Sequence, residues 1–280
     1  RSMAAALARA NGLKPFPATA QRAMALLAAP DTPLRAIREA LEHDPAITAG
    51  VLRIANSAVY RSRQTIASID EAVQRLGVRH VLEIVAGVAA MGLFKDAQGV
   101  GRRVKEHCTR VGAMTRVLAS EWHQRSAESP FLCGLLHDVG KLLLLQVGDE
   151  YQELEATIAS GADEAYVRER VALGYDHAVL GGHVLDSWKL PLHVAEVVAW
   201  HHQPGRAFAH GGELGIGVAL IRIANRIDYE MQARPDLNEA FIESLLLDGS
   251  VSYTGYQRPV LSAMWPKLRD AATQACSAIA

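Results

Sequence analysis

The stretch Phe131-Leu-Cys-Gly-Leu-Leu-His-Asp-Val-Gly-Lys-Leu-Leu-Leu-Leu145 is an apolar run interrupted by three polar side chains, His137, Asp138 and Lys141. Burying such groups costs several kcal/mol unless a partner or a bound ion satisfies them. A neighbouring His and Asp inside a buried helix suit either a divalent metal, which imidazole and carboxylate both ligate, or a closed hydrogen-bond network. In both cases the rest of the chain has to supply the partners.

The first third of the chain is predicted to be helical. Apolar residues recur at a spacing of three to four, without the alternation of strands, over residues 18–28, 34–43, 45–56 and 69–93. The expected helix ends agree, because Asp44 precedes Pro45 at a helix start, Ser68 can cap the last segment, and Gly77 breaks or bends it. These segments predict an N-terminal helical lobe.

Helical periodicity continues to the end of the chain. We expect helices over 102–123, 151–159 and 165–173, from His177 to Trp188, from Pro191 to His202, and over 218–231, 237–247 and 259–278. The glycine-rich residues 207–217 are expected to be a connection, and a turn around Gly249 and Gly255 is expected between the last two helices. The prediction is an all-α fold in three parts, with the polar stretch 95–101 between the lobes: an N-terminal lobe (13–95), a second helical lobe (102–235) and C-terminal helices packing on the core (236–280).

Composition excludes several classes of protein. Lys plus Arg number 29 against 30 for Asp plus Glu, and the charges are scattered, so neither nucleic acid nor an anionic membrane is an expected partner. The three cysteines are far apart without CxxC spacing, which fits a reducing cytoplasm. No apolar run reaches the roughly 18 residues of a membrane span. The start, Arg1-Ser2-Met3, resembles residues added for expression more than a signal peptide.

Several polar residues are predicted to face inward, each from a different helix: His107, the pair His137-Asp138, His177, the pair His201-His202, and Asp228. Helical bundles build metal sites by converging such side chains on one pocket. Asp228 would complete the coordination from the opposite side and leave positions for water or a phosphate oxygen. A lone inward histidine is more often a hydrogen-bonded core residue than a ligand. The combination favours a metal site, and a hydrogen-bond network is the alternative.

Other polar residues are given simpler roles. Lys141 could lie beside a phosphate, but a lysine that extends to solvent at a helix end is favoured. Cys133 is interpreted as a small core residue, and Cys108 points about 100° away from His107, so neither forms a nucleophilic dyad. The remaining histidines lack supporting spacing and are set aside: His43, His80, His123, His183, His193 and His210.

Specific motifs occur in both lobes. The first contains Phe16-Pro17, His43-Asp44-Pro45, Leu52-Arg-Ile-Ala-Asn-Ser-Ala-Val-Tyr60 and Ile69-Asp-Glu-Ala-Val-Gln-Arg-Leu-Gly77. The second contains Gly134-Leu-Leu-His-Asp-Val-Gly-Lys141, Glu169 ahead of Gly174-Tyr-Asp-His177, Trp188-Lys-Leu-Pro191, His201-His202, and Ala224-Asn225 with Asp228. From about residue 13 to residue 231, the chain resembles the HD superfamily, and specifically the HD-related output domain (HDOD) family.

The resemblance implies an N-terminal helical lobe packed against an HD-like helical bundle, in bacterial signalling and regulatory proteins usually viewed as non-catalytic output modules. The superfamily's enzyme branches hydrolyse phosphate esters with a metal set that maps onto four residues: His107, His137, Asp138 and Asp228. The second-metal histidines of the cyclic-di-GMP phosphodiesterase branch map onto His177, His201 and His202, and its motif lysine onto Lys141, which would have a catalytic role only in an enzyme. That branch has Gly-Tyr-Pro after the paired histidines, where this chain has Gln203-Pro-Gly-Arg-Ala207, so cyclic-di-GMP hydrolysis is not expected.

Two functions follow as expectations. The favoured one is a cytoplasmic signalling module that binds a partner protein or a small phosphorylated ligand, with a His/Asp cluster that can hold a divalent metal such as Fe, Mn or Zn. The alternative is a metal-dependent phosphohydrolase or phosphodiesterase on a nucleotide or another phosphoester. A third possibility, nucleic-acid binding by the arginines of the first lobe, is weaker because these arginines are interleaved with acids, as on a solvated helical face.

Overall fold

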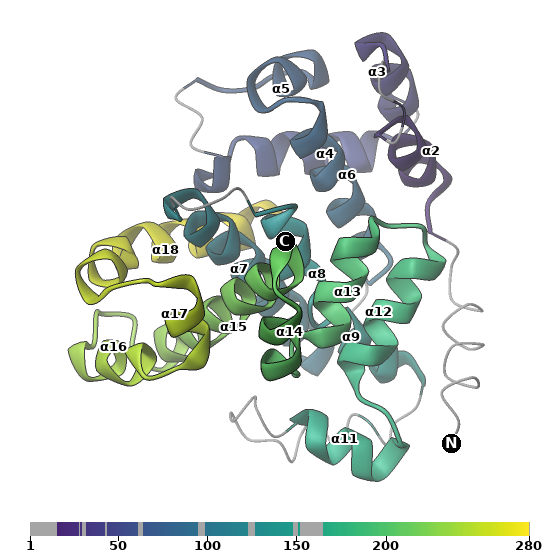
Figure 1. Ribbon diagram of the computed structural model, residues 1–280. Helices are drawn as coiled ribbons and strands as arrows, with labels where there is room; N and C mark the ends of the chain where they lie inside the picture. Colours follow the sequence, from purple (N-terminus) through teal and green to yellow (C-terminus); the bar gives the residue numbers. More distant parts are fainter. Residues whose placement is uncertain are drawn as a thin grey trace.

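Helices are the regular secondary structure of the described chain, and no strand occurs within it, which confirms the all-α prediction (Figure 1). The computed structural model describes residues 16–27, 29, 32–42, 44–60, 64–94, 99–122, 127–147, 151 and 165–279. Across these ranges no helix combines the length and the apolar character needed to traverse a bilayer. The helix predicted over 151–159 lies outside the described residues, apart from Tyr151.

The N-terminal lobe consists of α2 (Ala18–Leu27), α3 (Leu34–Glu42), α4 (Pro45–Ala55), the 3₁₀ turn η1 (Ala58–Tyr60), α5 (Ile69–Leu76) and α6 (Val78–Gly92). Its predicted caps are confirmed. The Asp44 side chain accepts a hydrogen bond from Ile47 N, and that of Ser68 accepts one from Glu71 N. Gly77 has φ 83° and separates α5 from α6, because this left-handed region is readily accessible only to glycine.

The second lobe contains α7 (Gly99–Glu121), α8 (Pro130–Leu136), α9 (Val139–Val147), α11 (Ala165–Leu173), α12 (His177–Ser187), α13 (Leu192–Trp200), α14 (Pro204–His210) and α15 (Gly212–Ala233). The expected connection over 207–217 was wrong. Pro204 begins a helix there, since its missing N–H costs nothing in a first turn, and Gly211 with φ 76° separates α14 from α15. Phe208 stacks on Tyr253 at 4.5 Å and holds α14 against the C-terminal helices.

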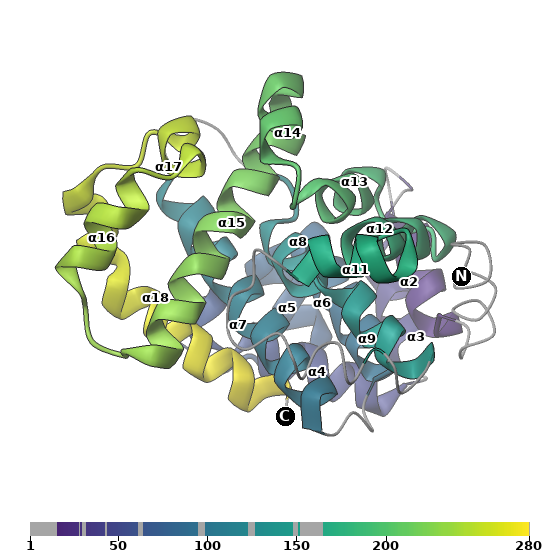
Figure 2. The same ribbon diagram turned by 90° about the horizontal axis from the view of Figure 1, so that it is seen from below.

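The C-terminal segment forms α16 (Glu239–Leu246), α17 (Gly249–Thr254) and α18 (Arg258–Ile279). The single turn expected around Gly249 and Gly255 is therefore a short helix, capped by Asp248 and ended by Gly255 in the left-handed conformation. Helix α18 packs along α7 and also contacts α4 and η1. Seen from below, α16 and α17 lie on one side of α15, and α12 and α13 lie on the other (Figure 2).

One continuous apolar core runs through both lobes and the C-terminal helices. Helix α6 of the N-terminal lobe packs on α8, so the stretch that contains His137 is enclosed between the lobe and the bundle. Helix α11 lies at the end of the bundle away from the N-terminal lobe (Figure 1). The boundaries at 95–101 and near 235 stay predictions, although α7 begins at Gly99, inside the stretch expected to separate the lobes.

Candidate metal centre

His137 and Asp138 lie at the junction between two helices. The helix expected across 131–145 is interrupted here, because α8 ends at Leu136 and α9 begins at Val139. The backbone carbonyl of Asp138 accepts a hydrogen bond from Lys141 N at 2.9 Å, which closes a tight turn at the start of α9. The junction itself is fully enclosed, since His137 is 0% and Asp138 3% exposed.

Gly140 lets a second helix approach this junction. A Cβ atom added to Gly140 would overlap the backbone carbonyl of His177, the first residue of α12. The Asp176 side chain caps α12 by accepting a hydrogen bond from Val179 N at 2.9 Å. The close contact of α9 with α12 therefore places the His177 ring beside Asp138, with His177 Nε2 2.9 Å from Asp138 Oδ1.

Six predicted site residues converge as two sets of ligand atoms that share Asp138. The first set is His107, His137 and Asp138, and the second is Asp138, His177, His201 and His202; within each set the ligand atoms lie within 4.8 Å of one another. The two oxygens of Asp138 face different sets. Oδ2 lies 3.8 Å from His107 Nε2 and 3.4 Å from His137 Nε2. Oδ1 faces His177 and lies 3.7 Å from His201 Nε2.

Three histidines of the cluster have the same hydrogen-bonding pattern. Their Nδ1 atoms contact acceptors that cannot donate: Asp228 Oδ2 for His107 at 2.7 Å, Gly134 O for His137 at 2.8 Å and Val198 O for His201 at 2.7 Å. Nδ1 must then carry the proton in a neutral ring, and Nε2 keeps its lone pair. All three Nε2 atoms are buried without a hydrogen-bond partner. Unsatisfied buried nitrogens cost free energy that a bound cation would recover.

His177 is held differently. Its Nδ1 and its backbone N both contact Glu169 Oε2, at 2.6 and 2.7 Å. Its Nε2 faces Asp138 and also lies 3.0 Å from His202 Nε2. Glu169 is 0% exposed and accepts a further hydrogen bond from the Tyr151 hydroxyl at 2.7 Å.

Asp228 belongs to neither set of ligand atoms. Arg110 donates two hydrogen bonds to the Asp228 carboxylate, from Nε to Oδ1 at 2.6 Å and from Nη2 to Oδ2 at 3.1 Å. His107 Nδ1 also contacts Oδ2. In this conformation Asp228 orients His107, the role that carboxylates commonly have behind a ligating histidine. Its direct coordination of a metal stays a prediction.

Lys141 does not extend to solvent as expected. It is 6% exposed, and its Nζ lies 2.9 Å from Asp138 Oδ2. The correction follows from the enclosed position of α9, which leaves the ammonium group no route to water and makes a buried carboxylate its ion-pair partner.

Comparisons with known proteins identify the family of this chain. Residues 13–204 match the HDOD domain. The chain belongs to the HDOD domain family. A curated relative, an uncharacterized protein of Treponema pallidum (strain Nichols), is 25% identical over 175 residues, which are 62% of this chain and 34% of that protein. The HDOD chain thus aligns with about a third of that relative's length.

Solved structures share the fold. A candidate phosphohydrolase from Shewanella amazonensis SB2B has a TM-score of 0.77 and 24% identity, with each chain covered completely. A candidate signal transduction protein from Marinobacter aquaeolei VT8 has a TM-score of 0.71 and 21% identity, covering 98% of this HDOD chain and 61% of that one. At these identities the likeness concerns the fold alone.

Burial and neighbouring charges shift the pKa values of the histidines in the HDOD cluster in different directions. Burial lowers the pKa of His137 to about 4 and holds the pKa values of His201 and His202 well below their usual range, with the neighbouring histidines adding to the effect. Burial also opposes a charged His177, but Glu169 and Asp138 outweigh it and raise the pKa of His177 to about 9. Burial opposes ionisation of Asp138 too, yet the charges of His137, Lys141 and His177 hold its pKa well below the usual range.

Several contacts around the cluster were not predicted from the sequence. Arg110 lies one turn after His107 on the same helix, and that i, i+3 spacing was the available signal. Tyr166 stacks on His202 with centroids 4.4 Å apart, which no local pattern indicated. Glu169 was noted in the sequence only as part of a motif, and its contact with His177 was not predicted.

Among the histidines set aside, His183 is exposed, and His43 and His123 lie outside the described residues.

The cysteines are consistent with core roles. Cys108 and Cys133 are buried, and burial raises the pKa of both thiols, which disfavours the reactive thiolate. The interpretation of Cys133 as a core residue agrees with this.

Proposed function

We propose that this HDOD protein is a regulatory output module of bacterial signalling that holds a divalent metal at the His/Asp cluster and acts by binding a partner protein or a small phosphorylated ligand. The ligands we assign are His107, His137, Asp138, His177, His201 and His202, with Asp228 either orienting His107 or ligating directly. Iron, manganese and zinc are the cations suited to this mixture of imidazole and carboxylate.

The donor set fits a metal on structural grounds. Three buried Nε2 atoms with no hydrogen-bond partner point from α7, the α8–α9 junction and the end of α13 toward Asp138. A cluster built only as a hydrogen-bond network would pair these nitrogens. The unpaired nitrogens are the observation that carries the metal assignment.

Burial favours a non-catalytic role. No residue of the two ligand sets is more than 8% exposed. Structural metal sites are closed by protein ligands, whereas catalytic ones keep a position open to substrate. A phosphoester would need a path through the surrounding helices, so in this conformation the cluster resembles a closed site.

Signalling as the context is supported by the HDOD family and by the description of the Marinobacter aquaeolei neighbour as a candidate signal transduction protein. The described cysteines Cys108, Cys133 and Cys276 form no disulfide, which suits a reducing compartment such as the cytoplasm.

One observation favours a second candidate function, a metal-dependent phosphohydrolase. The two oxygens of Asp138 face two different sets of nitrogen ligands, as a carboxylate does when it bridges two cations. Ions at such a site supply hydroxide at neutral pH and neutralise phosphate charge. In that case Lys141, already beside Asp138, would be the residue we assign a catalytic role.

Metal content and hydrolysis separate the two functions. The protein is purified without chelator, its metals are measured by elemental analysis, and it is incubated with Mn²⁺ and bis-p-nitrophenyl phosphate. We expect retained metal and a hydrolysis rate equal to that of Asp138→Ala. A metal-dependent rate well above that of the variant would replace the output module with the hydrolase. Less than about a tenth of a metal per chain after reloading would remove both metal-based functions.

A further inference from the structure

We infer that Glu169 and Tyr166 on α11 are positioning residues for the second ligand set alone, so that α11 controls one cation position of the cluster and leaves the other unaffected. The inference rests on the proposed metal binding and extends it from one cation to two, one at each ligand set, with separate supports for the two sets. Neither residue is itself in either set of ligand atoms.

Glu169 fixes the orientation of His177. One carboxylate oxygen, Oε2, contacts both Nδ1 and the backbone N of His177, so it locks the ring and the first turn of α12 together. The other oxygen, Oε1, accepts a hydrogen bond from Tyr151. Glu169 and His177 are both 0% exposed, and water cannot take over this role. With Nδ1 engaged, Nε2 is the nitrogen that faces Asp138.

Tyr166 fixes His202 by ring stacking. The two rings are 4.4 Å apart and inclined by 15°. The Arg170 guanidinium carbon lies over the Tyr166 ring, 5.1 Å from its centroid, and Arg170 Nε donates to Asp176 Oδ2 at 2.6 Å. Because Asp176 caps α12, α11 is attached to the start of that helix as well as to the histidines.

The first ligand set has separate supports. His107 is oriented by Asp228, which Arg110 holds, and His137 is oriented by the carbonyl of Gly134. These groups belong to α7, α8 and α15. Figure 1 shows α11 at the far end of the bundle, where it contacts α12. A change on α11 therefore reaches the first set only through Asp138.

The test counts cobalt ions bound to the whole chain. Stripped wild type, Glu169→Gln and Tyr166→Leu are titrated with Co²⁺ by calorimetry, with visible absorption as the readout of cobalt geometry. Wild type should bind two ions. Both variants should keep the first and bind the second about 10–100-fold more weakly, the usual cost of removing a group behind a ligand. Glu83→Gln is the matched control, because Glu83 is also a buried carboxylate (3% exposed) but contacts Ser129 and Arg79.

A milder variant covers the case in which Glu169→Gln does not fold. Tyr151→Phe removes the hydroxyl that donates to Glu169 Oε1 and should weaken the binding of the second ion in the same direction. The inference is overturned if the variants bind both ions like wild type, if both ions weaken equally, or if wild type binds a single ion. Wild type that binds no cobalt at all contradicts the proposed function instead.

Discussion

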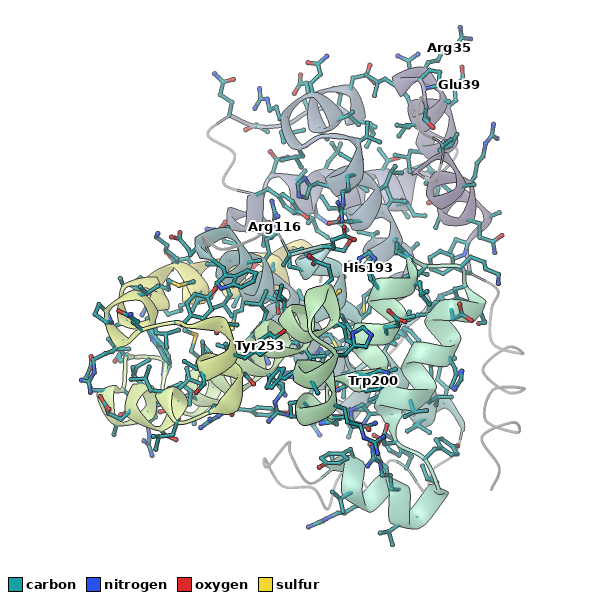
Figure 3. The ribbon with its side chains drawn as sticks, viewed as in Figure 1. Arg35, Glu39, Arg116, His193, Trp200 and Tyr253 are labelled. Carbon is teal, nitrogen blue, oxygen red and sulfur yellow. The ribbon has the colours of Figure 1, made fainter. Side chains whose placement is uncertain are left out.

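Charged groups on the outer face of the N-terminal lobe and in the His/Asp cluster are satisfied in opposite ways. Arg35 and Glu39 lie one turn apart on α3, 2.6 Å from each other, with side chains 79% and 45% exposed (Figure 3). Arg38 pairs with Asp70 at 3.3 Å, also at the surface. In the cluster the polar groups are buried, and four histidine nitrogens have no hydrogen-bond partner.

The difference shows why composition alone does not locate a site. The surface arginines of the first lobe have acids beside them and water around them, so they need no ligand, as expected for a solvated helical face. The buried histidines lack water around them, and the Nε2 atoms of His107, His137 and His201 have no hydrogen-bond partner. Several unsatisfied buried nitrogens gathered around one carboxylate, rather than the density of charge, mark the candidate site.

Removing Asp138 should have the largest effect, because both ligand sets share it. Asp138→Ala removes the buried carboxylate that Lys141 and the Nε2 atom of His177 both contact, and breaking a buried ion pair in this way typically costs about 3–5 kcal/mol. We expect that loss in the free energy of unfolding, measured with urea in chelator, together with no retained metal. Asp186→Ala, at an exposed position of α12, is the control. Unchanged stability and full metal content in Asp138→Ala would contradict the account.

Replacing Arg110 should damage the first set more than the second. Arg110→Gln removes a two-pronged contact to Asp228, and hydrogen bonds to charged groups contribute about 1.5–3 kcal/mol each. We expect weaker binding of the first cobalt ion by about 10–100-fold in calorimetry, because Asp228 no longer holds His107. The exposed Arg103 on the same helix provides the control Arg103→Gln. If both variants bind the first cobalt ion with equal affinity, the contact of Arg110 with Asp228 is not needed to hold His107.

Adding a methyl group at Gly140 should separate α9 from α12. The new Cβ meets backbone, which no rotamer change relieves, so Gly140→Ala is expected to cost about 1–3 kcal/mol in urea unfolding. Gly205→Ala is the matched control, since nothing lies within 4 Å of its added Cβ. If both variants unfold at the same urea concentration, the close approach of α12 is not needed to place His177.

Breaking a surface pair should have the smallest effect. Glu39→Ala removes the partner of Arg35, but both side chains are surrounded by water and salt screens their attraction. The thermal midpoint should match wild type within the scatter of repeated scans, and metal content should be unchanged. A clear loss in either quantity would remove the contrast between the two regions.

The helical architecture was predictable because its signals are local. Apolar spacing gave most helices, and Asp44, Ser68 and Gly77 marked their ends as the structure has them. The prediction failed where local signals conflict. Glycines over 207–217 indicated a loop, but Pro204 and the packing of Phe208 on Tyr253 make it helical. The His137-Asp138 junction was hidden because the residues on both sides of it are continuously apolar.

The site was predictable in its members but not in its connections. Polar residues in apolar helices identified His107, His137 and His177 one by one, and the fold brings them together. Which atom of each ring is free depends on contacts between residues far apart in sequence, such as His107 with Asp228. Sequence spacing carries no information on such contacts, which is why the pairing of Arg110 with Asp228 was found only in the structure. The ion pair of Lys141 with Asp138 spans only three residues, but its burial depends on the packing of α9 and was also found only in the structure.

Anomalous diffraction from crystals reloaded with Zn²⁺ tests the central claim most directly. Data collected on both sides of the zinc absorption edge should show a peak at the cluster, bonded to His107 Nε2, His137 Nε2 and an oxygen of Asp138 at about 2.0–2.2 Å. A cluster without a peak, or peaks only at exposed acidic side chains, would contradict metal binding and leave the buried histidines as parts of a hydrogen-bond network.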